Sequence, residues 1–354
     1  VADMDFRAPP AVETALAGAL DHGVHGYFGD DSAYRAALVG WMKRRHGWDV
    51  DPKWIINAHG LGYGVSLCVQ AFSQPGDGVI VFSPVYHAFA RIIKANGRQL
   101  LESPLVERDG RYHMDLEQLE AQLTGNEKIL LFCSPHNPGG RVWDKQELTA
   151  LAAFCNKHDL LLISDEVHND LVFAPAQHSV LATAVPDISH RLVTLVATTK
   201  TFNLAGTMIG SMVTADDHLR QKISRVAAAY STSFNRLGMM MTETAWRTGD
   251  AWLDALLPYL AENRRIFEEG VNQIAGVKAM SLDATYLCWV DFSDTGMDRA
   301  EFIRRVQNDA EIAANHGASF GRGGESFLRF NIACRRALVD EAVARLHRAF
   351  ADLQ

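Results

Sequence analysis

The sequence has few cysteines and no pattern of them that could hold a metal or a set of disulfides. Its 354 residues include five cysteines, and no two of them form a CxxC pair. Each lies in an apolar or helical stretch, so we expect buried free thiols. The fourteen histidines are scattered, and the pair His22 and His25 is more typical of a loop than of a zinc motif. We therefore expect no metal site.

Basic tracts and long apolar runs are also missing. Lys and Arg number 34 against 42 Asp and Glu, which gives a net charge of −8 and argues against a nucleic-acid-binding surface. No run is long enough to span a membrane and no segment resembles a signal peptide, so we expect no membrane partner and a cytoplasmic location. The composition, 48% hydrophobic and 21% charged, is typical of a soluble globular protein, and this length allows about two compact units.

One lysine follows a short strand pattern. Leu192–Val196 is apolar and β-branched, as in a strand that is buried on both faces, and Thr198, Thr199 and Lys200 follow it. The carboxyl end of an interior strand is where open α/β sheets bind ligands. Burial favours a neutral amine, which can form a Schiff base. On this stretch alone, an ordinary surface lysine is the better interpretation.

Two upstream strands of the same kind change this interpretation. Lys128–Cys133 is an apolar run that leads to Asn137, and Leu160–Ser164 is another that leads to Asp165 and His168. Each predicted strand thus ends in polar groups that are capable of chemistry.

The segment between these two strands is predicted to be a helix. Asp144–His158 has apolar residues at helical spacing. A strand–helix–strand unit makes its strands parallel, with their carboxyl ends at one edge of the sheet. The side chains that we expect to converge there are Asn137, Asp165, His168 and Lys200.

These motifs resemble those of the fold-type I pyridoxal phosphate (PLP) enzymes. Asn137–Gly140, Asp165–His168 and Thr199–Asn203 are similar to the asparagine, aspartate and lysine motifs of that group. Within it, the chain is identified as aminotransferase class I/II-like and is most similar to the cystathionine β-lyase or C–S lyase branch. The segments that carry this similarity, in order, are Val1–Phe6, Gly26–Phe28, Trp41–Trp48, Ser83–Tyr86, Ser134–Trp143 and Lys200–Gly206. Val1 lies inside one of these motifs, which leaves open whether residues precede it.

The resemblance implies an α/β fold with a smaller second domain. A mostly parallel, seven-stranded sheet between helices is expected in a large PLP-binding domain of residues 27–255. Residues 1–26 and 256–354 are expected to form a small α+β domain. The pattern also predicts helices at Ser231–Arg247 and Trp252–Ile274, the second leading into the small domain.

The resemblance also implies how PLP is held. Lys200 would carry the cofactor as a Schiff base, and Asp165 would pair with its pyridine nitrogen. Asn137 and His168 would hydrogen-bond its phenolic oxygen. Tyr86 would stack on the ring, although core packing is the ordinary role of a lone tyrosine.

The cofactor phosphate is expected at a glycine-rich junction between strand and helix. Backbone N–H groups at such a junction can face an anion, although a tight turn is the alternative. The resemblance assigns the phosphate to Gly60, Leu61 and Gly62, with Thr199 also binding the cofactor. Gly206–Gly210 lacks the arginine that related aminotransferases carry there, which argues against a plain aminotransferase.

Two further residues take their roles from the resemblance. Tyr27 lies in an aromatic, glycine-rich loop that could be a plain linker; the resemblance implies that it reaches the partner's phosphate in a homodimer with shared active sites. Arg329 lies among apolar residues, where a cation needs an anionic partner. That partner is either an internal acid or a substrate carboxylate, which suits a bidentate guanidinium, and the resemblance favours the substrate.

The expected activity is a PLP-dependent C–S β-lyase acting on cystathionine or a related cysteine S-conjugate. Lys200, as a free amine, would remove the α-proton of the amino-acid substrate. Loss of the β-thiolate would then give a thiol, pyruvate and ammonia. An aminotransferase is the alternative, as is a PLP-binding protein whose main role is to contact a regulatory partner.

Overall fold

The central element of the computed structural model, which describes residues 2–353, is a seven-stranded sheet. Its order is β1-β9-β8-β7-β6-β2-β3, and β9 alone is antiparallel to its neighbours. The strands are β1 (Ile55–Ala58), β2 (Gly78–Ser83), β3 (Gln99–Pro104), β6 (Glu127–Cys133), β7 (Leu161–Asp165), β8 (Leu192–Val196) and β9 (Gly210–Val213). The expected α/β fold with a mostly parallel sheet is confirmed.

Helices cover both faces of this sheet, which is why its strands are apolar throughout. In β6, Ile129 and Leu131 pack on one face, and Leu130 and Phe132 pack on the other. The first face is covered by α3 (Leu61–Phe72), α4 (Ala88–Ala95) and α9 (Asp217–Ala228). The second is covered by α5 (Leu116–Gln122), α6 (Lys145–Lys157) and α7 (Leu181–Ala184).

A third group of helices packs against the β1–β9 end of the sheet and shares a core with Ile55 of β1 and Val213 of β9. It consists of α1 (Pro10–His22), α2 (Ser32–His46) and α10 (Arg236–Thr248). The helix predicted at Ser231–Arg247 is α10, which begins at Arg236 and thus later than predicted. Asn235 caps it, since its side chain accepts a hydrogen bond from the Leu237 amide, and the preceding residues are not helical.

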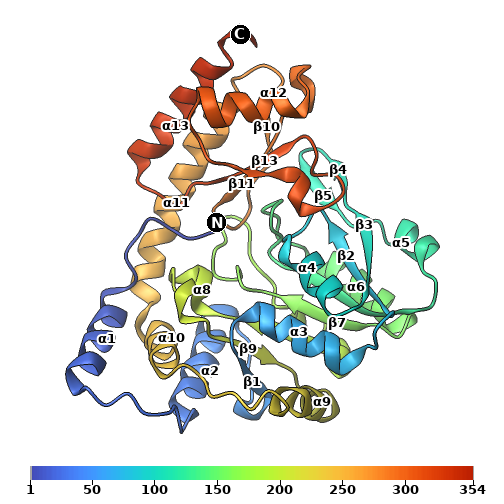
Figure 1. The fold of residues 1–354 in the computed structure, drawn as a ribbon, viewed down its shortest axis with the longest axis vertical. Helices are drawn as coiled ribbons and strands as arrows, with labels where there is room; N and C mark the ends of the chain where they lie inside the picture. The colour runs from blue at the N-terminus through green and yellow to red at the C-terminus, as the bar shows by residue number, and fades with distance from the viewer. Residues whose placement is uncertain (1, 354) are drawn as a thin grey trace.

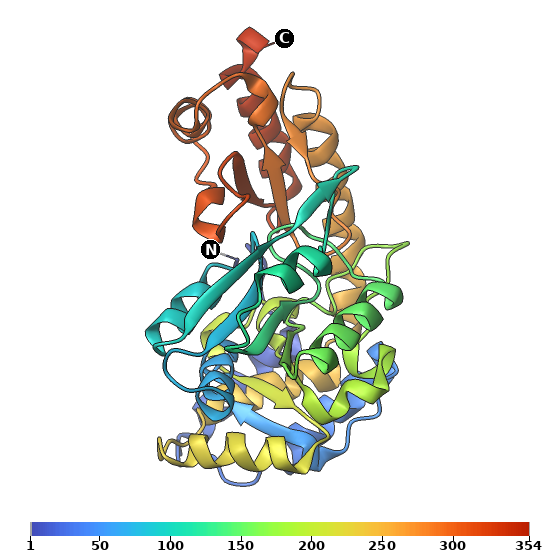
Figure 2. The ribbon, with the colours of Figure 1, turned by 90° about the vertical axis from the view of Figure 1, so that its right-hand side faces the viewer.

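The second part of the molecule is a small antiparallel sheet with helices beside it (Figure 1). Its strand order is β10-β11-β13-β12, and α11 extends from it down to the large sheet (Figure 2). The elements are β10 (Lys278–Ala279), β11 (Leu287–Asp291), β12 (Asn315–His316), β13 (Phe327–Asn331), α11 (Asp250–Val271), α12 (Arg299–Arg304) and α13 (Arg336–Ala349). A separate ribbon is formed by β4 (Val106–Arg108) and β5 (Arg111–His113). The smaller α+β part is confirmed, and the residue boundaries between the domains stay a prediction.

The strands β6, β7 and β8 are parallel and end at the same edge of the sheet. Cys133 is paired with Asp165, and Asp165 is paired with Leu195. The predicted helix between β6 and β7 is α6, and it begins with a capping box in which Asp144 and Glu147 satisfy each other's backbone amides. Lys200 follows β8 in the short helix α8 (Thr198–Thr201).

The N-terminal segment, residues 2–6, connects the two parts of the molecule. On one side, the Asn203 side chain accepts a hydrogen bond from the Met4 amide at 2.9 Å and donates one to the Met4 carbonyl at 2.8 Å. On the other, the Asp5 amide donates to the Ala333 carbonyl at 2.8 Å, just beyond β13. The segment is thus bound both near α8 and near the small sheet.

A glycine beside β12 should be intolerant of any side chain. A β-carbon at Gly317 would overlap the backbone oxygens of Gly324 and Phe327. We expect Gly317→Ala to lower the free energy of unfolding by about 2–4 kcal/mol. Gly18→Ala, in the open interior of α1, should raise it by about 0.5–1 kcal/mol. Chemical denaturation measures both, and equal effects would contradict the packing at Gly317.

Candidate active site

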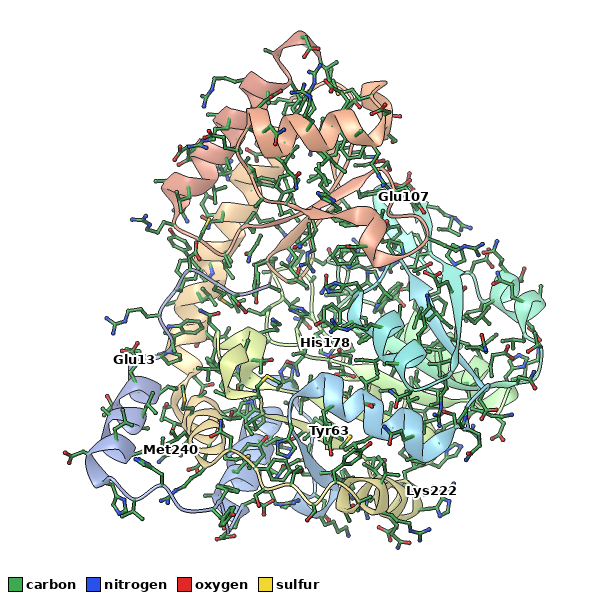
Figure 3. All side chains as sticks on the ribbon, viewed as in Figure 1. Glu13, Tyr63, Glu107, His178, Lys222 and Met240 are labelled. Carbon is green, nitrogen blue, oxygen red and sulfur yellow. The ribbon has the colours of Figure 1, made fainter. Side chains whose placement is uncertain are left out.

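A cavity of about 620 Å³ lies at the carboxyl ends of β6, β7 and β8. Its walls come from the large sheet, from α3, from the N-terminal segment and from β12 and β13 of the small sheet. Tyr63, labelled on α3 in Figure 3, lies in one of these walls. The cavity therefore lies where the two parts of the molecule meet.

Every predicted site residue except Tyr27 lines this cavity. These residues are Gly60, Leu61, Gly62, Tyr86, Asn137, Asp165, His168, Thr199, Lys200 and Arg329. Tyr27 lies elsewhere and is 90% exposed. The individual roles expected of these residues stay predictions.

Lys200 lies in the cavity with its amine held by the backbone. Its Nζ donates a hydrogen bond to the Ala2 carbonyl at 3.0 Å. Burial lowers the pKa of this amine, because a charged ammonium loses hydration there. No ion pair within residues 2–353 includes Lys200. The neutral, nucleophilic form of the lysine is thereby favoured.

Among the described residues, two buried polar side chains beside Lys200 lack some of the hydrogen-bond or ion-pair partners that such groups usually have. Asp165 accepts a hydrogen bond from the Val167 amide at 3.2 Å, and burial raises the pKa of its carboxyl to about 7. The Nδ1 atom of His168 is buried and has no hydrogen-bond partner among the described residues. Burial lowers the pKa of His168 to about 3, so its ring is neutral. Buried groups of this kind normally have partners.

Arg329, on β13, is buried and forms no ion pair with an acid of residues 2–353. Its Nη1 donates to Asn137 Oδ1 at 2.9 Å and its Nη2 donates to Asn315 Oδ1 at 2.8 Å. Its guanidinium lies over the Phe320 ring at 4.8 Å. Its Nε has no hydrogen-bond partner in the described structure, and burial lowers its pKa to about 10. The internal acid that was one alternative for this arginine is not among its contacts.

The start of α3 leaves backbone amides free for an anion. Gly60 precedes the helix with φ of 80°, a conformation that favours glycine. No side chain caps this end, and the first turn has no acidic residue. Leu61 and Gly62 begin the helix and line the cavity. An anion at this position would be stabilised by the N–H groups and by the helix dipole.

Two buried histidine–carboxylate pairs adjoin the site residues, and sequence reasoning did not find them. His178, labelled in Figure 3, lies 2.8 Å from Glu166, and His46 lies 2.7 Å from Asp170. Asp170 also accepts a hydrogen bond from Thr201 at 2.7 Å, next to Lys200. His46 and Asp170 are 124 residues apart, so no local pattern could reveal their contact.

Asp3 and Asn315 are also among the cavity residues that were missed. Asp3 lies in a motif quoted above but received no role, and Asn315 lies in a strand of two residues that has no recognisable periodicity. Asn315 could be found only through its contact with Arg329.

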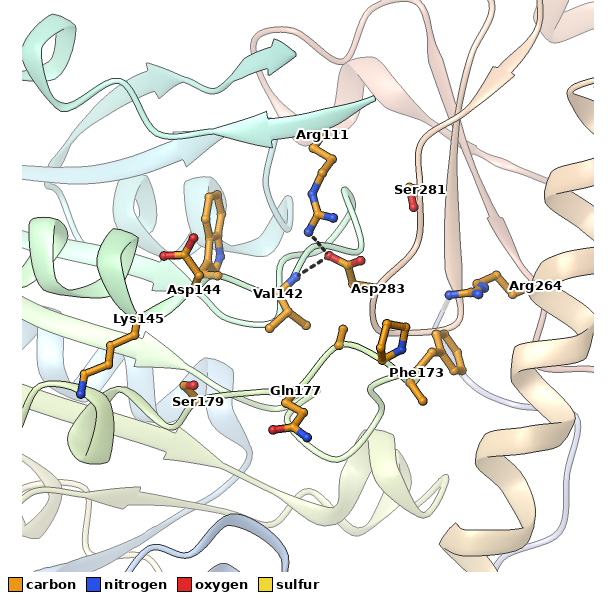
Figure 4. A pocket seen from close by; sticks show the side chains of 14 residues that line it. Arg111, Val142, Asp144, Lys145, Phe173, Gln177, Ser179, Arg264, Ser281 and Asp283 are labelled. Carbon is orange, nitrogen blue, oxygen red and sulfur yellow. Dashed lines mark hydrogen bonds and ion pairs between the residues drawn. The ribbon is translucent and has the colours of Figure 1, made fainter. Parts of the chain in front are cut away.

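A second cavity, of about 540 Å³, lies outside this site (Figure 4). Asp283 joins its two sides, since its carboxylate pairs with Arg111 and accepts a hydrogen bond from the Val142 amide at 3.4 Å. None of the predicted site residues lines it. Between residues 2 and 353 there is no cluster of three or more His, Cys, Asp or Glu suited to a metal ion, and no described helix has the length and apolar character needed to cross a membrane.

The fold and this cavity define a PLP-dependent enzyme. The chain belongs to the class I and II aminotransferase family, whose sequence model matches residues 2–346.

Three individual relatives show which members of this family the chain is similar to. Cystathionine beta-lyase PatB of Bacillus subtilis is 38% identical over 352 residues, covering 99% of this chain and 91% of the relative. Cystalysin from Treponema denticola, whose crystal structure contains pyridoxal 5'-phosphate, has a TM-score of 0.95 and 36% identity over 100% of this chain and 91% of its own. The PLP-bound C–S lyase from Staphylococcus hominis has a TM-score of 0.92 and 29% identity, covering 99% and 87%.

Pyridoxal 5'-phosphate is the cofactor of this family's PLP-bound structures and of this chain. The cavity fits it in several respects. Among residues 2–353, it offers the amine of Lys200, a buried acid at Asp165 that forms no ion pair, and a ring nitrogen of His168 that has no hydrogen-bond partner. It also offers an uncapped helix end at Gly60 for the phosphate.

The raised pKa of Asp165 predicts a cost in the cofactor-free protein. Its carboxyl titrates near 7 when folded and near 3.8 when unfolded. Through Asp165, the free energy of unfolding therefore falls as the pH rises from about 4 to about 7, and it stays lower above that range. We expect cofactor-free Asp165→Asn to be more stable than the wild type at pH 8, by on the order of a few kcal/mol, and equal to it near pH 4. Thermal unfolding of both proteins measures this; the exposed Asp5→Asn is the control, and a wild type more stable at pH 8 would contradict the prediction.

Proposed function

We propose that the chain is a C–S β-lyase that cleaves cystathionine or related cysteine S-conjugates to a thiol, pyruvate and ammonia. The observation that carries this proposal is the 38% identity to a cystathionine β-lyase over 99% of the chain. The similarity to cystalysin and to a C–S lyase supports it. So does the absence of an arginine between Gly206 and Gly210.

Arg329 holds the α-carboxylate of the substrate. Within the described part of the chain, its buried guanidinium has no acidic partner and its Nε forms no hydrogen bond. Removing a lone buried cation from water is costly, and a carboxylate ligand offsets that cost with charge-assisted hydrogen bonds. Asn137 and Asn315 fix the guanidinium plane through their side-chain oxygens.

The groups around Lys200 hold the cofactor. Asp165 pairs with the pyridine nitrogen, and Asn137 and His168 hydrogen-bond the phenolic oxygen. Asn137 can do this through its Nδ2 because its Oδ1 already binds Arg329. Tyr86, half-buried in the cavity wall, stacks on the ring.

The phosphate end is held mainly by backbone. Gly60, Leu61 and Gly62 supply the amides at the start of α3, and Thr199 lies across the cavity from them. Backbone amides at a helix N-terminus can bind an anion by themselves, so a phosphate site of this kind needs no arginine.

Lys200 acts as the general base. Bound pyridoxal phosphate supplies an electron sink for the charge left when the α-proton is removed. Burial lowers the pKa of the Lys200 amine and so favours the neutral form that can accept that proton, while the Ala2 carbonyl orients the amine through its hydrogen bond. Asp165 strengthens the sink by holding a proton on the pyridine nitrogen. The bond between the β-carbon and sulfur then breaks, and its electron pair leaves on the thiolate.

The enzyme acts as a homodimer in which Tyr27 serves the partner's phosphate site. Leu20, Val24 and Tyr27 are 58%, 63% and 90% exposed, and large apolar side chains exposed together support an interface. In a second copy, Tyr27 would find the phosphate that it does not reach within its own chain.

An aminotransferase is the second candidate, and membership of the class I and II aminotransferase family favours it. Both reactions use the same proton removal by Lys200. They differ in whether a β-thiolate leaves or the proton returns to the cofactor.

The product profile tests the proposed function. With cystathionine, the holoenzyme should release a thiol and pyruvate in equal amounts without added keto acid. Lys200→Ala should lose this activity and the visible absorbance of the bound cofactor, because the amine carries both. Thiol is measured with a disulfide reagent and pyruvate with lactate dehydrogenase. Amino transfer that requires a keto acid and releases no thiol would establish the aminotransferase instead.

Mixed dimers test the role of Tyr27. Tyr27→Ala and Lys200→Ala should each be poorly active alone. If Tyr27 serves the partner, a hybrid of the two has one site with both residues intact, and activity should recover to about half of the wild type per hybrid dimer. Separately tagged subunits allow the hybrid to be purified and assayed. Activity that stays at the level of the Tyr27→Ala protein would place Tyr27 outside the partner's site.

A further inference from the structure

The cavity contains one acid that the proposed reaction does not use. Asp3 and Asp165 are the acids that line it in the described part of the chain. Asp165 is buried, and its proposed partner is the pyridine nitrogen. Asp3 belongs to the N-terminal segment and has an exposed side chain.

The backbone around Asp3 is fixed on both sides. The Ala2 carbonyl accepts hydrogen bonds from Lys200 Nζ at 3.0 Å and from the Tyr286 hydroxyl at 2.8 Å. The carbonyl of Asp3 itself accepts one from Asn331 Nδ2 at 2.6 Å. With Met4 held by Asn203 and Asp5 by Ala333, the position of Asp3 is determined before any substrate arrives.

The carboxylate of Asp3 has no internal partner to explain this placement. No hydrogen bond or ion pair to its side-chain oxygens is formed within residues 2–353. Asp3 lines the same cavity as Lys200, and the Ala2 carbonyl directly before it accepts the hydrogen bond of the Lys200 amine. Burial has the largest effect on the pKa of that lysine and lowers it, and Asp3 has the next largest and raises it. A carboxylate is thus held at the rim of the cavity.

The other charged groups of the cavity leave one part of the substrate for Asp3. Arg329 takes the α-carboxylate, Lys200 acts at the α-carbon and Asp165 lies below the cofactor ring. The substrate's sulfur and the group attached to it remain. A carboxylate on that side attracts a cation and repels an anion.

We propose that Asp3 binds a cationic group at the far end of the leaving thiol, so that the enzyme prefers cysteine S-conjugates whose thiol carries an ammonium. This inference rests on the proposed lyase function and gives its substrate class. Asp3 takes no part in bond breaking. It positions the leaving side of the substrate, and because it is exposed its effect should weaken as the salt concentration rises.

Three conjugates of similar length provide the first test. S-(2-aminoethyl)cysteine ends in an ammonium, S-propylcysteine in a methyl group and S-(2-carboxyethyl)cysteine in a carboxylate. In the wild type, kcat/KM should fall in that order. Asp3→Asn should reduce the aminoethyl-to-propyl ratio by about threefold to tenfold and raise the relative rate for the carboxyethyl conjugate. Asp5→Asn, in the same segment but outside the cavity, should leave the ratio unchanged.

A binding experiment separates this inference from the lyase activity. Lysine has a methylene in place of the sulfur of the aminoethyl conjugate and cannot undergo the elimination, and 2-aminoheptanoate is its counterpart for the propyl conjugate. Titration of the holoenzyme, followed by the cofactor spectrum, should show tighter binding of lysine, and Asp3→Asn should remove that preference.

The outcomes are distinct. If no conjugate releases thiol but the preference for lysine depends on Asp3, the lyase assignment is wrong and the cation site stands. If thiol is released and neither ratio changes in Asp3→Asn, the cation site is wrong and the lyase stands. An equal loss with all three conjugates would also overturn the inference, because it would reflect damage to the site as a whole.

Discussion

The site depends on charged and polar groups that are buried without the partners that normally accompany them. Arg329 has no acid, Asp165 has no cation in bonding contact, and the Nδ1 atom of His168 has no hydrogen-bond partner among the described residues. Each arrangement costs stability in the free protein. A cofactor with a pyridine nitrogen and a phenolic oxygen, together with a substrate carboxylate, provides the missing partners. These buried groups thus gain their missing partners when the cofactor and the substrate are both bound.

The rest of the fold keeps these groups in place. Three parallel strands deliver Asn137, Asp165 and Lys200 to one edge of the large sheet, and β13 brings Arg329 from the small sheet to meet them. Behind them, the Asp170 carboxylate binds both His46 and Thr201 and so fixes the short helix that carries Lys200. The precision of the site comes from buried strands and buried polar pairs more than from loops.

Local patterns predicted the strands β6, β7 and β8 because they are short, apolar and buried on both faces, and each is followed by polar residues. The seven-stranded sheet as a whole was implied by the family resemblance. The same reasoning and the family resemblance led to the residues that line the cavity. Helix ends were less predictable, as at Ser231–Arg247, where the cap at Asn235 decides the start. The contacts of Asp3, Asn315 and the two histidine–carboxylate pairs were not predicted. Those of Asp3 with Asn331 and of His46 with Asp170 join segments that are distant in the sequence. The other two span 14 and 12 residues, but no periodic pattern marks Asn315 or His178.

The N-terminal segment has a mechanical consequence. Its residues bond alternately to the two parts of the molecule. Ala2 and Met4 bond to Lys200 and Asn203, and Asp3 and Asp5 bond to Asn331 and Ala333. The two parts therefore cannot move apart without breaking hydrogen bonds of this segment. Any movement of β13 away from the large sheet would pull on the same short stretch of backbone that holds the Lys200 amine.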